Sequence, residues 1–489
     1  MTHTINNLLK FVLVALLFGL FAVFLLHPLF AINQDLGRYF KVSEIILQTG
    51  SVPDTNLFSY TNTDFPFINT HWLGGLVFYL LSLVIGLKGL IVFKTIVVLS
   101  SFGLVFYLAL KKSKNFWLVS AVSLPAMIVF AERTDVRPEI FSFLFFTLFF
   151  YILYNYRSGS KAIWALPFIQ LLWVNTHVYF FLGPLLFLFF FVEKIFQQKD
   201  KTELKKFLIV GFLVAIAIFI NPNAIGGALY PVTAMGDYGY TIVENQTPFF
   251  LLAYNYHKGI IALFFLMSFF ILVGFLINYK KLKIFELLTA VFFCFFGMYA
   301  VRNFPVFVLV AMPVLARNFS MPWFRFRDFL KDFFESKKTS CGELFLLVGC
   351  VVFLSGIIFA NKDKINLNTE ARAENAVNFL IENDINGKMF NNFDVGGYLI
   401  YRLYPEIKVF VDNRPEAYPV SFLQDVYIPM QEQEELWKKY STEYNFDFIF
   451  FEHTDITPWA QKFLEMIPSD KNWKQVYYDD SEVIFVKND

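Results

Sequence analysis

Long apolar runs recur along most of this chain and constrain its fold more than any other feature. A helix needs about 20 apolar residues to cross a bilayer core of about 30 Å. A shorter run at 71–86 reaches only about 24 Å as a helix, so we expect it to re-enter the membrane or lie at its interface. We predict membrane helices at residues 11–30, 90–110, 116–131, 140–156, 162–176, 178–192, 207–220, 259–277, 284–300, 304–316 and 344–360.

These runs predict an α-helical polytopic membrane protein with about 11 or 12 membrane helices. We expect the first run to be kept as a membrane helix, because it is too long for a signal-peptide core and no small-residue cleavage pattern follows it. Of the 489 residues, 57% are hydrophobic and 17% charged, unlike a soluble enzyme. The lipid bilayer is therefore the expected environment. The net charge of +1 gives no reason to expect nucleic acid as a partner.

The positions of lysine and arginine predict which loops face the cytoplasm, because basic residues in short loops resist translocation. Two predicted helices separate each basic loop from the next, so all of these loops fall on one side. The predicted cytoplasmic loops are 111–114, 157–161, 193–206, 279–283 and 325–338. The opposite side then receives residues 32–88, 132–139, 175–177, 221–258, Arg302 and everything after 360. We therefore expect a multi-pass protein of the cytoplasmic membrane with an extracytoplasmic C-terminal domain.

The composition changes to mixed polar sequence at residue 362, which predicts two domains. Residues 1–361 form the membrane domain, with a long first outer loop at 31–70, and residues 362–489 form a small soluble α/β domain. Residue periodicity distinguishes helices from strands in this second part. We predict helices at 370–383, 397–403 and within 422–440, strands at 389–393, 407–412 and 446–451, and a hairpin of 476–478 with 483–486.

Polar residues concentrate at the predicted outer ends of the membrane helices. Charged side chains at membrane depth are costly and often functional, and the predicted topology puts all of these residues on the non-cytoplasmic side. We therefore predict that they share a site. The candidates are Asp35, Arg38, Tyr39, His71, Trp72, Arg133, Asp135, Arg137, Asn175, His177 and Arg302.

Each candidate also has a structural explanation. Asp35 precedes a segment with helical periodicity and is a favoured N-cap residue, while Arg133 and Arg137 could anchor the chain at lipid headgroups. Polar groups can also satisfy a broken helix internally, which applies to Asn175, His177 and Arg302. In the second domain, Asp412, Asn413 and Arg414 follow a predicted strand, where either a binding site or an ordinary turn is expected.

Three segments carry a resemblance to a known family: INQDLGRYFKVSEIILQTGSVPDTNLFSYT at 32–61, HWLGGLVFYLLSLVIG at 71–86 and ERTDVRPEIFSF at 132–143. Together with about a dozen membrane helices and an outer C-terminal domain, this layout resembles the GT-C superfamily of polytopic membrane glycosyltransferases. The resemblance covers roughly the N-terminal two-thirds of the chain. It implies that a sugar passes from a polyprenyl-phosphate-linked donor to a glycan, lipid or protein acceptor at the outer membrane face.

The resemblance also implies roles for the candidate residues. A positioned carboxylate, Asp35, would act as the base toward the acceptor, and arginines would hold the departing phosphate. The remaining candidates would bind substrate. Cofactors are unknown from the sequence, and a divalent cation, Mg²⁺ or Mn²⁺, could be held by Asp35 and Asp135.

Two departures from the superfamily leave the acceptor open. Leu36 follows Asp35, where protein mannosyltransferases have a glutamate, and no WWDYG-type signature of oligosaccharyltransferases is present. The alternatives are a lipid or oligosaccharide transporter or flippase, and a noncatalytic GT-C-like assembly subunit. A transporter uses polar residues near the middle of the membrane and repeated halves, whereas here the polar residues lie mostly at helix ends.

Overall fold

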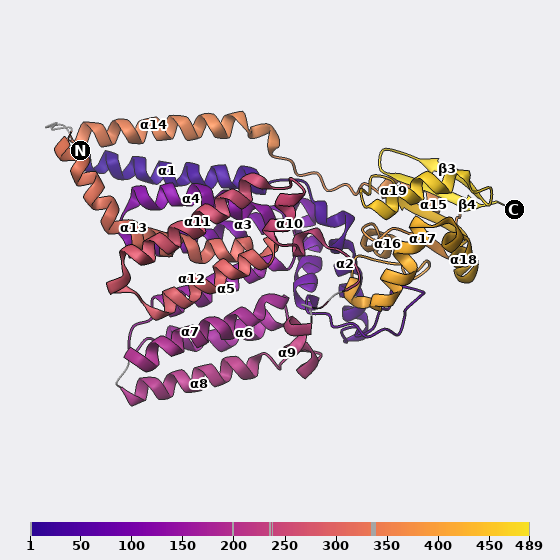
Figure 1. Cartoon of the computed structure of the whole chain (residues 1–489), viewed down its shortest axis with the longest axis horizontal. Helices are drawn as coiled ribbons and strands as arrows, with labels where there is room; N and C mark the ends of the chain where they lie inside the picture. The colour runs from indigo at the N-terminus through magenta and orange to yellow at the C-terminus, as the bar shows by residue number, and fades with distance from the viewer. Residues whose placement is uncertain (1, 198–199, 234–235, 237, 334–338, 489) are drawn as a thin grey trace.

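The structure, a computed structural model, describes residues 2–197, 200–233, 236, 238–333 and 339–488. Residues 334–338 of the predicted basic loop at 325–338 lie outside this description. A bundle of long helices forms one part of the molecule and a smaller mixed domain forms the other (Figure 1). The bundle helices run roughly along the long axis, whereas α2 (Asp35–Thr49) lies across that direction at the end next to the smaller domain (Figure 1).

The bundle contains helices at or near all the predicted membrane runs. The first half comprises α1 (Thr2–Leu25), α3 (Trp72–Ser113), α4 (Phe116–Phe130), α5 (Glu139–Tyr154), α6 (Leu166–Val174), α7 (Leu182–Gln197) and α8 (Lys201–Ala217). The second half comprises α9 (Ala224–Thr233), α10 (Pro248–Ala253), α11 (Lys258–Ile277), α12 (Ile284–Tyr299), α13 (Phe304–Phe333) and α14 (Thr339–Ala360). Six helices within the described residues are long and apolar enough to cross a membrane. The α-helical membrane fold is thereby confirmed, while the number of crossings stays a prediction.

The apolar runs at 71–86 and 90–110, which we predicted as separate helices, lie in the single element α3 and meet at a sharp break. Gly86 has φ 68° and ψ 178°, a conformation that side chains with a Cβ rarely adopt. Just before the break, Leu83 and Val84 are 66% and 82% exposed, as expected for apolar side chains that face lipid. A glycine thus separates the two runs without a loop.

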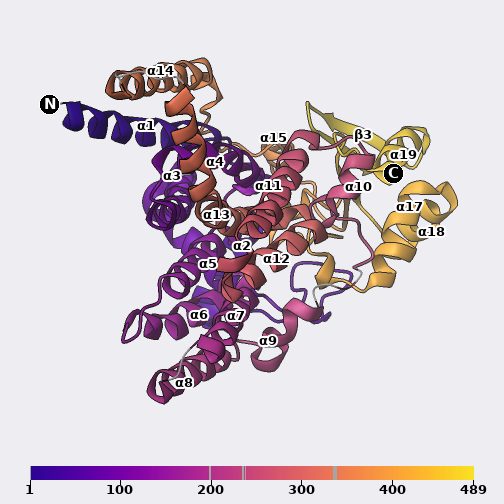
Figure 2. The same ribbon diagram turned by 60° about the vertical axis from the view of Figure 1, so that its left-hand side comes forward.

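Aromatic packing holds the bundle together around α13. The 20 residues Val301–Ser320 form the most buried of the candidate spans, with 83% of the apolar window inside the molecule. Phe264 of α11 stacks on Phe304 of α13 with ring centroids 4.5 Å apart. At the edge of the bundle, α14 packs against α1, and both views show the two helices side by side (Figures 1 and 2).

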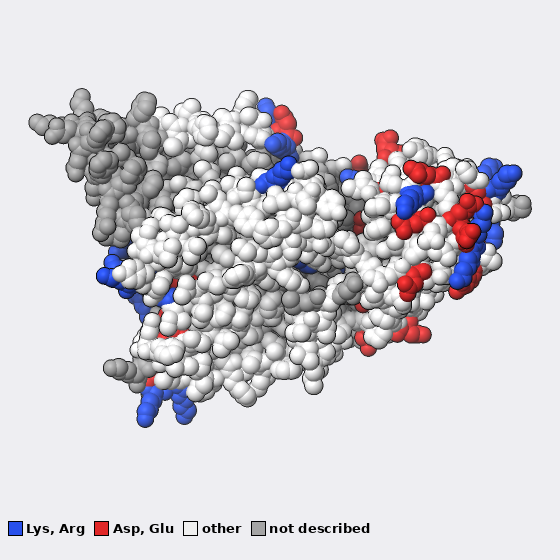
Figure 3. All heavy atoms as spheres, in the orientation of Figure 1, with Lys and Arg blue, Asp and Glu red and all other residues white. Residues whose placement is uncertain are grey.

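The predicted basic loops meet at the end of the bundle far from the smaller domain. Lys112 Nζ donates to the Tyr154 carbonyl (2.8 Å), and Arg317 Nη2 donates to the Lys281 carbonyl (3.2 Å). Figure 3 shows Lys and Arg at this end, an uncharged band along the bundle, and mixed charges on the smaller domain. This charge distribution fits a membrane protein. Which side each end faces stays a prediction.

The C-terminal domain is a small α/β unit, as predicted. Its helices are α15 (Glu374–Glu382), α16 (Gly396–Leu403), α17 (Ile428–Glu432), α18 (Glu434–Tyr444) and α19 (Pro458–Met466). Its strands β1 (Met389–Asn391), β2 (Phe448–Glu452), β3 (Trp473–Tyr478) and β4 (Glu482–Lys487) form a sheet in the order β1-β2-β4-β3. Strand β1 pairs parallel with β2, and the other two pairs are antiparallel.

The predicted strand at 407–412 is wrong. Side-chain hydrogen bonds replace its strand pairing: Asn391 Oδ1 accepts from the Phe410 amide (2.9 Å), and Asn391 Nδ2 donates to the Val411 carbonyl (2.8 Å). On the other side, the segment makes an isolated bridge between Val409 and Ser59 of the first outer loop. The apolar run is therefore buried as predicted, but an asparagine and a distant loop satisfy its backbone.

The first outer loop packs into the C-terminal domain. Tyr60 donates its hydroxyl to the Met389 carbonyl (2.8 Å), and Arg414 Nη2 donates to Asn56 Oδ1 (2.7 Å). Phe67 belongs to the apolar core of that domain. Residues from the first outer loop and from beyond 362 therefore build one packed unit, which α2 joins to the bundle.

Candidate active site

A cavity of about 850 Å³ lies between the bundle and the C-terminal domain. One side of the cavity is formed by residues from α2, the 133–139 segment, the 240–244 segment and the turn before α13. The other side is formed by residues of the C-terminal domain. We call these two sides the bundle wall and the domain wall. Of the eleven predicted site residues, the bundle wall holds Asp35, Arg38, Tyr39, His71, Arg133, Arg137, His177 and Arg302.

Asp35 is the first residue of α2 and lies in the bundle wall. Its Oδ1 accepts from Arg38 Nη2 (2.9 Å) and from Asn413 Nδ2 (3.0 Å), and its Oδ2 lies 3.4 Å from Arg137 Nε. The N-cap position of α2 belongs to Gln34, and the hydrogen bonds of the Asp35 carboxylate among the described residues go to side chains. The explanation of Asp35 as an ordinary N-cap therefore does not fit, and its carboxylate instead joins α2, the loop before α5 and the C-terminal domain.

The charges around Asp35 keep it ionised. Burial raises the pKa of this carboxyl, but Arg137 and Arg38 outweigh the burial, so the net pKa is lowered. Its position in the first turn of α2 adds the favourable field of the helix N-terminus. At neutral pH, Asp35 is therefore a carboxylate that can accept a hydrogen bond or a proton.

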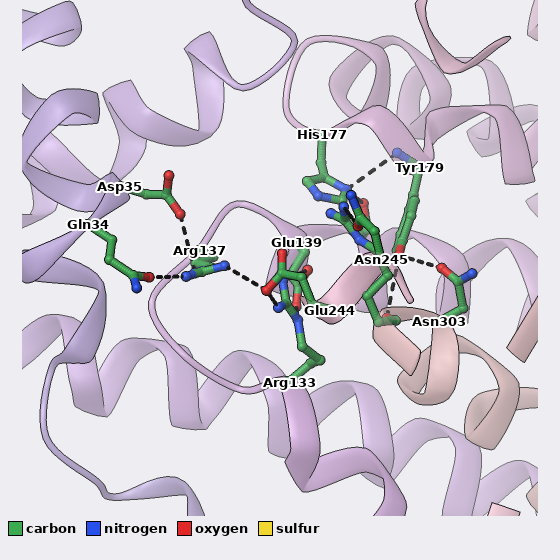
Figure 4. A network of polar contacts seen from close by, with 12 residues as sticks. Gln34, Asp35, Arg133, Arg137, Glu139, His177, Tyr179, Glu244, Asn245 and Asn303 are labelled. Carbon is green, nitrogen blue, oxygen red and sulfur yellow. Dashed lines mark hydrogen bonds and ion pairs between the residues drawn. The ribbon is translucent and has the colours of Figure 1, made fainter. Parts of the chain in front are cut away.

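Arg133 and Arg137 belong to a network that joins the loop before α5 to the loop that contains Glu244 (Figure 4). Arg133 forms two parallel hydrogen bonds to Glu139, Nε to Oε1 and Nη2 to Oε2, each 3.1 Å. Arg133 also pairs with Glu244, whose Oε2 lies 3.4 Å from Arg137 Nη1. Arg137 Nη2 donates to Gln34 Oε1 (2.6 Å). Bidentate pairing gives these guanidinium groups a defined orientation toward the cavity.

The other bundle-wall candidates lie on the side near α13. The His71 and His177 rings are 5.1 Å apart, and His177 Nδ1 and Ser142 Oγ form a hydrogen bond of 2.9 Å. Arg302 Nη1 donates to Asn245 Oδ1 (2.8 Å), while its buried Nε has no hydrogen-bond partner among the described residues. An N–H group buried without a partner is costly, so this guanidinium has spare capacity for a ligand.

Three of the predicted site residues do not line the cavity. Trp72 Nε1 donates to Asn175 Oδ1 (3.1 Å), and Asn175 Nδ2 donates to the Ile220 carbonyl (2.9 Å). These hydrogen bonds satisfy polar groups at the ends of bundle helices, as the structural explanation of Asn175 proposed. Asp135 Oδ1 accepts from the Val136 amide (2.8 Å) and turns the loop that presents Arg133 and Arg137.

Sequence reasoning missed several residues of the cavity. Glu139 is in the ERTDVRPE segment that we singled out, two residues after Arg137, so a search for the arginines' partners could have found it. Glu244 lies in the outer loop 221–258 without any motif around it. In the domain wall, Asn413 was a candidate as a strand-end residue. No motif marks the remaining acidic residues of this wall, which are Asp394, Glu416, Glu452, Asp455 and Glu482.

The donor set does not suit a divalent cation at Asp35. Its carboxylate already faces two guanidinium groups, and Asp135 does not join it in the cavity lining. In the part of the chain that the structure describes, no group of three or more His, Cys, Asp or Glu side chains is arranged to hold a metal ion. The predicted pair of cation ligands is therefore not brought together.

A second cavity of about 460 Å³ adjoins the first. The two share Arg302, Tyr240, Thr241 and Ile242 in their linings. The second cavity is also lined by apolar side chains from the bundle, which are Val178, Phe181, Phe296 and Tyr299. A phosphate at Arg302 would therefore have polar space on one side and an apolar lining on the other.

No protein-family model and no curated protein sequence matches the chain. Solved structures do. The archaeal oligosaccharyltransferase AglB from Archaeoglobus fulgidus, in complex with an inhibitory peptide and a dolichol-phosphate, superposes with a TM-score of 0.62 at 12% identity, covering 98% of this chain and 74% of that chain. The chain has the GT-C fold.

Other solved structures agree to different degrees. The same archaeal enzyme in complex with zinc and sulfate gives a TM-score of 0.58 at 13% identity, over 97% of this chain and 73% of that chain. ArnT from Cupriavidus metallidurans in the apo state gives 0.49 at 12% identity, over 96% of both chains, too low a score to add to the assignment. The GT-C resemblance seen in the sequence is thus confirmed as a fold.

Proposed function

We propose that this GT-C protein is a membrane glycosyltransferase that moves a sugar from a polyprenyl-phosphate-linked donor to an acceptor at the outer face of the cytoplasmic membrane. One observation carries the proposal: an ionised Asp35 lies between arginines in a cavity that the bundle and the C-terminal domain build together. The archaeal oligosaccharyltransferase of the same fold binds a dolichol-phosphate and a peptide, which supports a lipid-linked donor.

Asp35 acts on the acceptor in this proposal. As the bond between the sugar's anomeric carbon and the phosphate oxygen breaks, the anomeric centre becomes cationic and the acceptor hydroxyl becomes more acidic. A new bond forms between the acceptor oxygen and the anomeric carbon, and Asp35 takes the hydroxyl proton. Because the pKa of Asp35 is lowered, it takes the proton late in this process. The carboxylate also stabilises the positive charge that develops on the sugar.

Arginines of the bundle wall receive the other product, the polyprenyl phosphate. A guanidinium group stays charged and binds phosphate oxygens through paired N–H donors. Arg302, Arg38 and Arg137 each have a buried Nε without a hydrogen-bond partner among the described residues, and Arg133 reaches the same cavity. The smaller cavity beside Arg302, which polar and apolar side chains line together, is the proposed place for the first part of the lipid chain.

The direct test replaces Asp35 by Asn in the full-length protein. Purified protein in nanodiscs is supplied with a panel of radiolabelled sugars on decaprenyl phosphate, and the release of decaprenyl phosphate is measured. We expect Asp35→Asn to lower the rate about 10²–10⁴-fold, the usual contribution of a general base. Binding of decaprenyl phosphate should remain, because the arginines are untouched.

Two controls keep this test specific. Asp54→Asn changes an exposed carboxylate of the same outer loop and should leave the rate unchanged. Asp135→Asn should retain most of the rate, because Asp135 does not line the cavity. Full activity of Asp35→Asn would remove Asp35 as the base. Binding of the donor without any turnover in the wild-type protein would favour the assembly-subunit alternative.

A further inference from the structure

The two walls of the large cavity carry opposite charges. The domain wall holds five carboxyl groups, on Asp394, Glu416, Glu452, Asp455 and Glu482. Arg372 is the one Lys or Arg that the described part of the domain places in this lining, and its side chain is 60% exposed and 3.8 Å from Glu452. The bundle wall, by contrast, contains four arginines and three carboxyl groups, on Asp35, Glu139 and Glu244. We call the carboxyl groups Asp394, Glu452, Asp455 and Glu482 the acidic wall.

Glu482 is the most unusual member of the acidic wall. It is 1% exposed, and its buried Oε2 has no hydrogen-bond partner within the described residues. In the β2–β4 pair, Glu482 lies directly opposite Glu452, a placement of like charges that destabilises a sheet. A strand position that a Thr or Val would fill without cost is thus occupied by a buried carboxyl group that faces the cavity.

Asp394 and Asp455 extend this pattern. Asp455 is satisfied by the protein, because its Oδ1 accepts from the Thr457 amide (2.8 Å) and its Oδ2 from Asn392 Nδ2 (3.2 Å). Asp394 has neither a hydrogen bond nor an ion pair from its side chain to any residue that the structure describes. Burial and the nearby charges of Asp455 and Glu452 raise the pKa of Asp394 to about 7, and burial and Glu452 raise that of Glu482. Of the four carboxyl groups, Asp455 and Glu452 thus have donors from the protein, whereas Asp394 and Glu482 have none among the described residues.

We infer that the acidic wall binds the acceptor substrate through a protonated amine on that acceptor. The inference rests on the proposed glycosyltransferase function and adds the chemical class of the acceptor. An ammonium group brings one positive charge and three N–H donors, which match a group of neighbouring carboxyl groups of which two, Asp394 and Glu482, lack partners among the described residues. The acceptor hydroxyl that reacts lies toward Asp35, which Asn413 of the domain already contacts.

Opposite charges on the two walls would also keep the two substrates apart. The donor phosphate is attracted to the arginines of the bundle wall and repelled by the acidic wall, and an amine has the reverse preference. Asp35 lies where the walls meet, bonded to Arg38 on one side and Asn413 on the other. Each substrate therefore approaches Asp35 from its own side.

The test compares two probes that differ in one group. Binding of 2-aminoethyl glucoside and of 2-hydroxyethyl glucoside to the full-length protein is measured by isothermal titration calorimetry at pH 7.5. We expect the amine probe to bind at least about tenfold more tightly. Glu482→Gln and Asp394→Asn should each weaken the amine probe about tenfold, and the exposed Glu465→Gln of α19 should not. Equal binding of the two probes, or unchanged binding in both variants, would overturn the inference.

Further measurements separate this inference from the proposed function and identify the source of the amine. Decaprenyl phosphate binding should be unchanged in Glu482→Gln and Asp394→Asn, so a protein that binds the amine probe but no decaprenyl phosphate would contradict only the proposed function. Nanodiscs containing phosphatidylethanolamine are compared with phosphatidylglycerol nanodiscs. Competition by the former assigns the amine to a lipid headgroup, and its absence assigns it to a soluble acceptor. If one variant does not fold, the other provides the test.

Discussion

The bundle wall and the domain wall of the cavity treat their charged groups differently. In the bundle wall, Asp35 and Glu139 are each bonded to arginine. In the domain wall, Glu452 lies 3.8 Å from Arg372, but the buried Glu482 and the half-buried Asp394 have no such partner among the described residues. Paired charges hold a defined geometry, whereas unpaired buried charges cost stability until a ligand supplies the missing partner. The comparison suggests that one wall is preorganised and that the other is completed by substrate.

The largest expected effect comes from breaking a pair in the bundle wall. Glu139→Gln removes the bidentate partner of Arg133, whose side chain is 12% exposed, and Glu139 itself is 5% exposed. Losing one partner of a buried ion pair costs about 3–5 kcal/mol. We therefore expect a large drop in the midpoint of thermal unfolding, measured in detergent. A change within error would mean that Glu244 alone is enough to hold Arg133.

The stability that Asp394 contributes should depend on pH in the opposite sense to the stability that a paired carboxylate contributes. The pKa of Asp394 is raised to about 7, above the unfolded value of about 4, so the folded state binds a proton more tightly. Stability is then fully present below about pH 4 and is lost as pH rises through about 7. The charged groups that act on Asp394, from its own domain and from the bundle, are Asp35, Arg137, Glu452 and Asp455.

The measurement for this pH prediction is the unfolding temperature between pH 5 and 8. Wild-type protein should lose stability across this range, and Asp394→Asn should flatten the curve. Glu465→Gln, with its exposed side chain, serves as the matched variant and should follow the wild type. A wild-type curve that rises with pH would show that Asp394 is paired after all.

The smallest effect is expected at Glu244, which bonds both Arg133 and Arg137 but whose side chain is 28% exposed. If the donor phosphate binds these arginines, Glu244 competes with it. Partly exposed pairs contribute up to about 1 kcal/mol, so Glu244→Gln should tighten decaprenyl phosphate binding about two- to fivefold. Weaker binding would instead make Glu244 a positioning residue for the arginines.

Much of the fold was predictable because its signals are local. Apolar length predicted where the long helices of the bundle lie. A small α/β unit follows the shift in composition, and the boundary at residue 362 stays a prediction. The strand predicted at 407–412 was wrong because its partners are Asn391 and Ser59. Nothing local to an apolar segment tells whether a strand or a side chain will satisfy its backbone.

The candidate site was predictable mainly on its bundle side, and Asn413 was the one candidate from the domain wall. Asp35, Arg133 and Arg137 stand next to apolar runs, where a charge needs an explanation. Glu482 and Asp394 stand in ordinary polar sequence, and their character depends on burial that only the folded domain creates. Trp72 and Asn175 also lie at the ends of apolar runs, as the bundle-wall residues do. They hydrogen-bond to each other and do not line the cavity.

The hydrogen bond from Asn413 to Asp35 joins residues that are 378 positions apart. A ribosome must therefore translate most of the protein before the two walls can face each other. Until then, a nascent chain carries Asp35 and the arginines on one open surface. Assembly of the complete cavity is thus a late event in biosynthesis, and a chain halted before residue 413 would lack the contact that joins Asp35 to the domain wall.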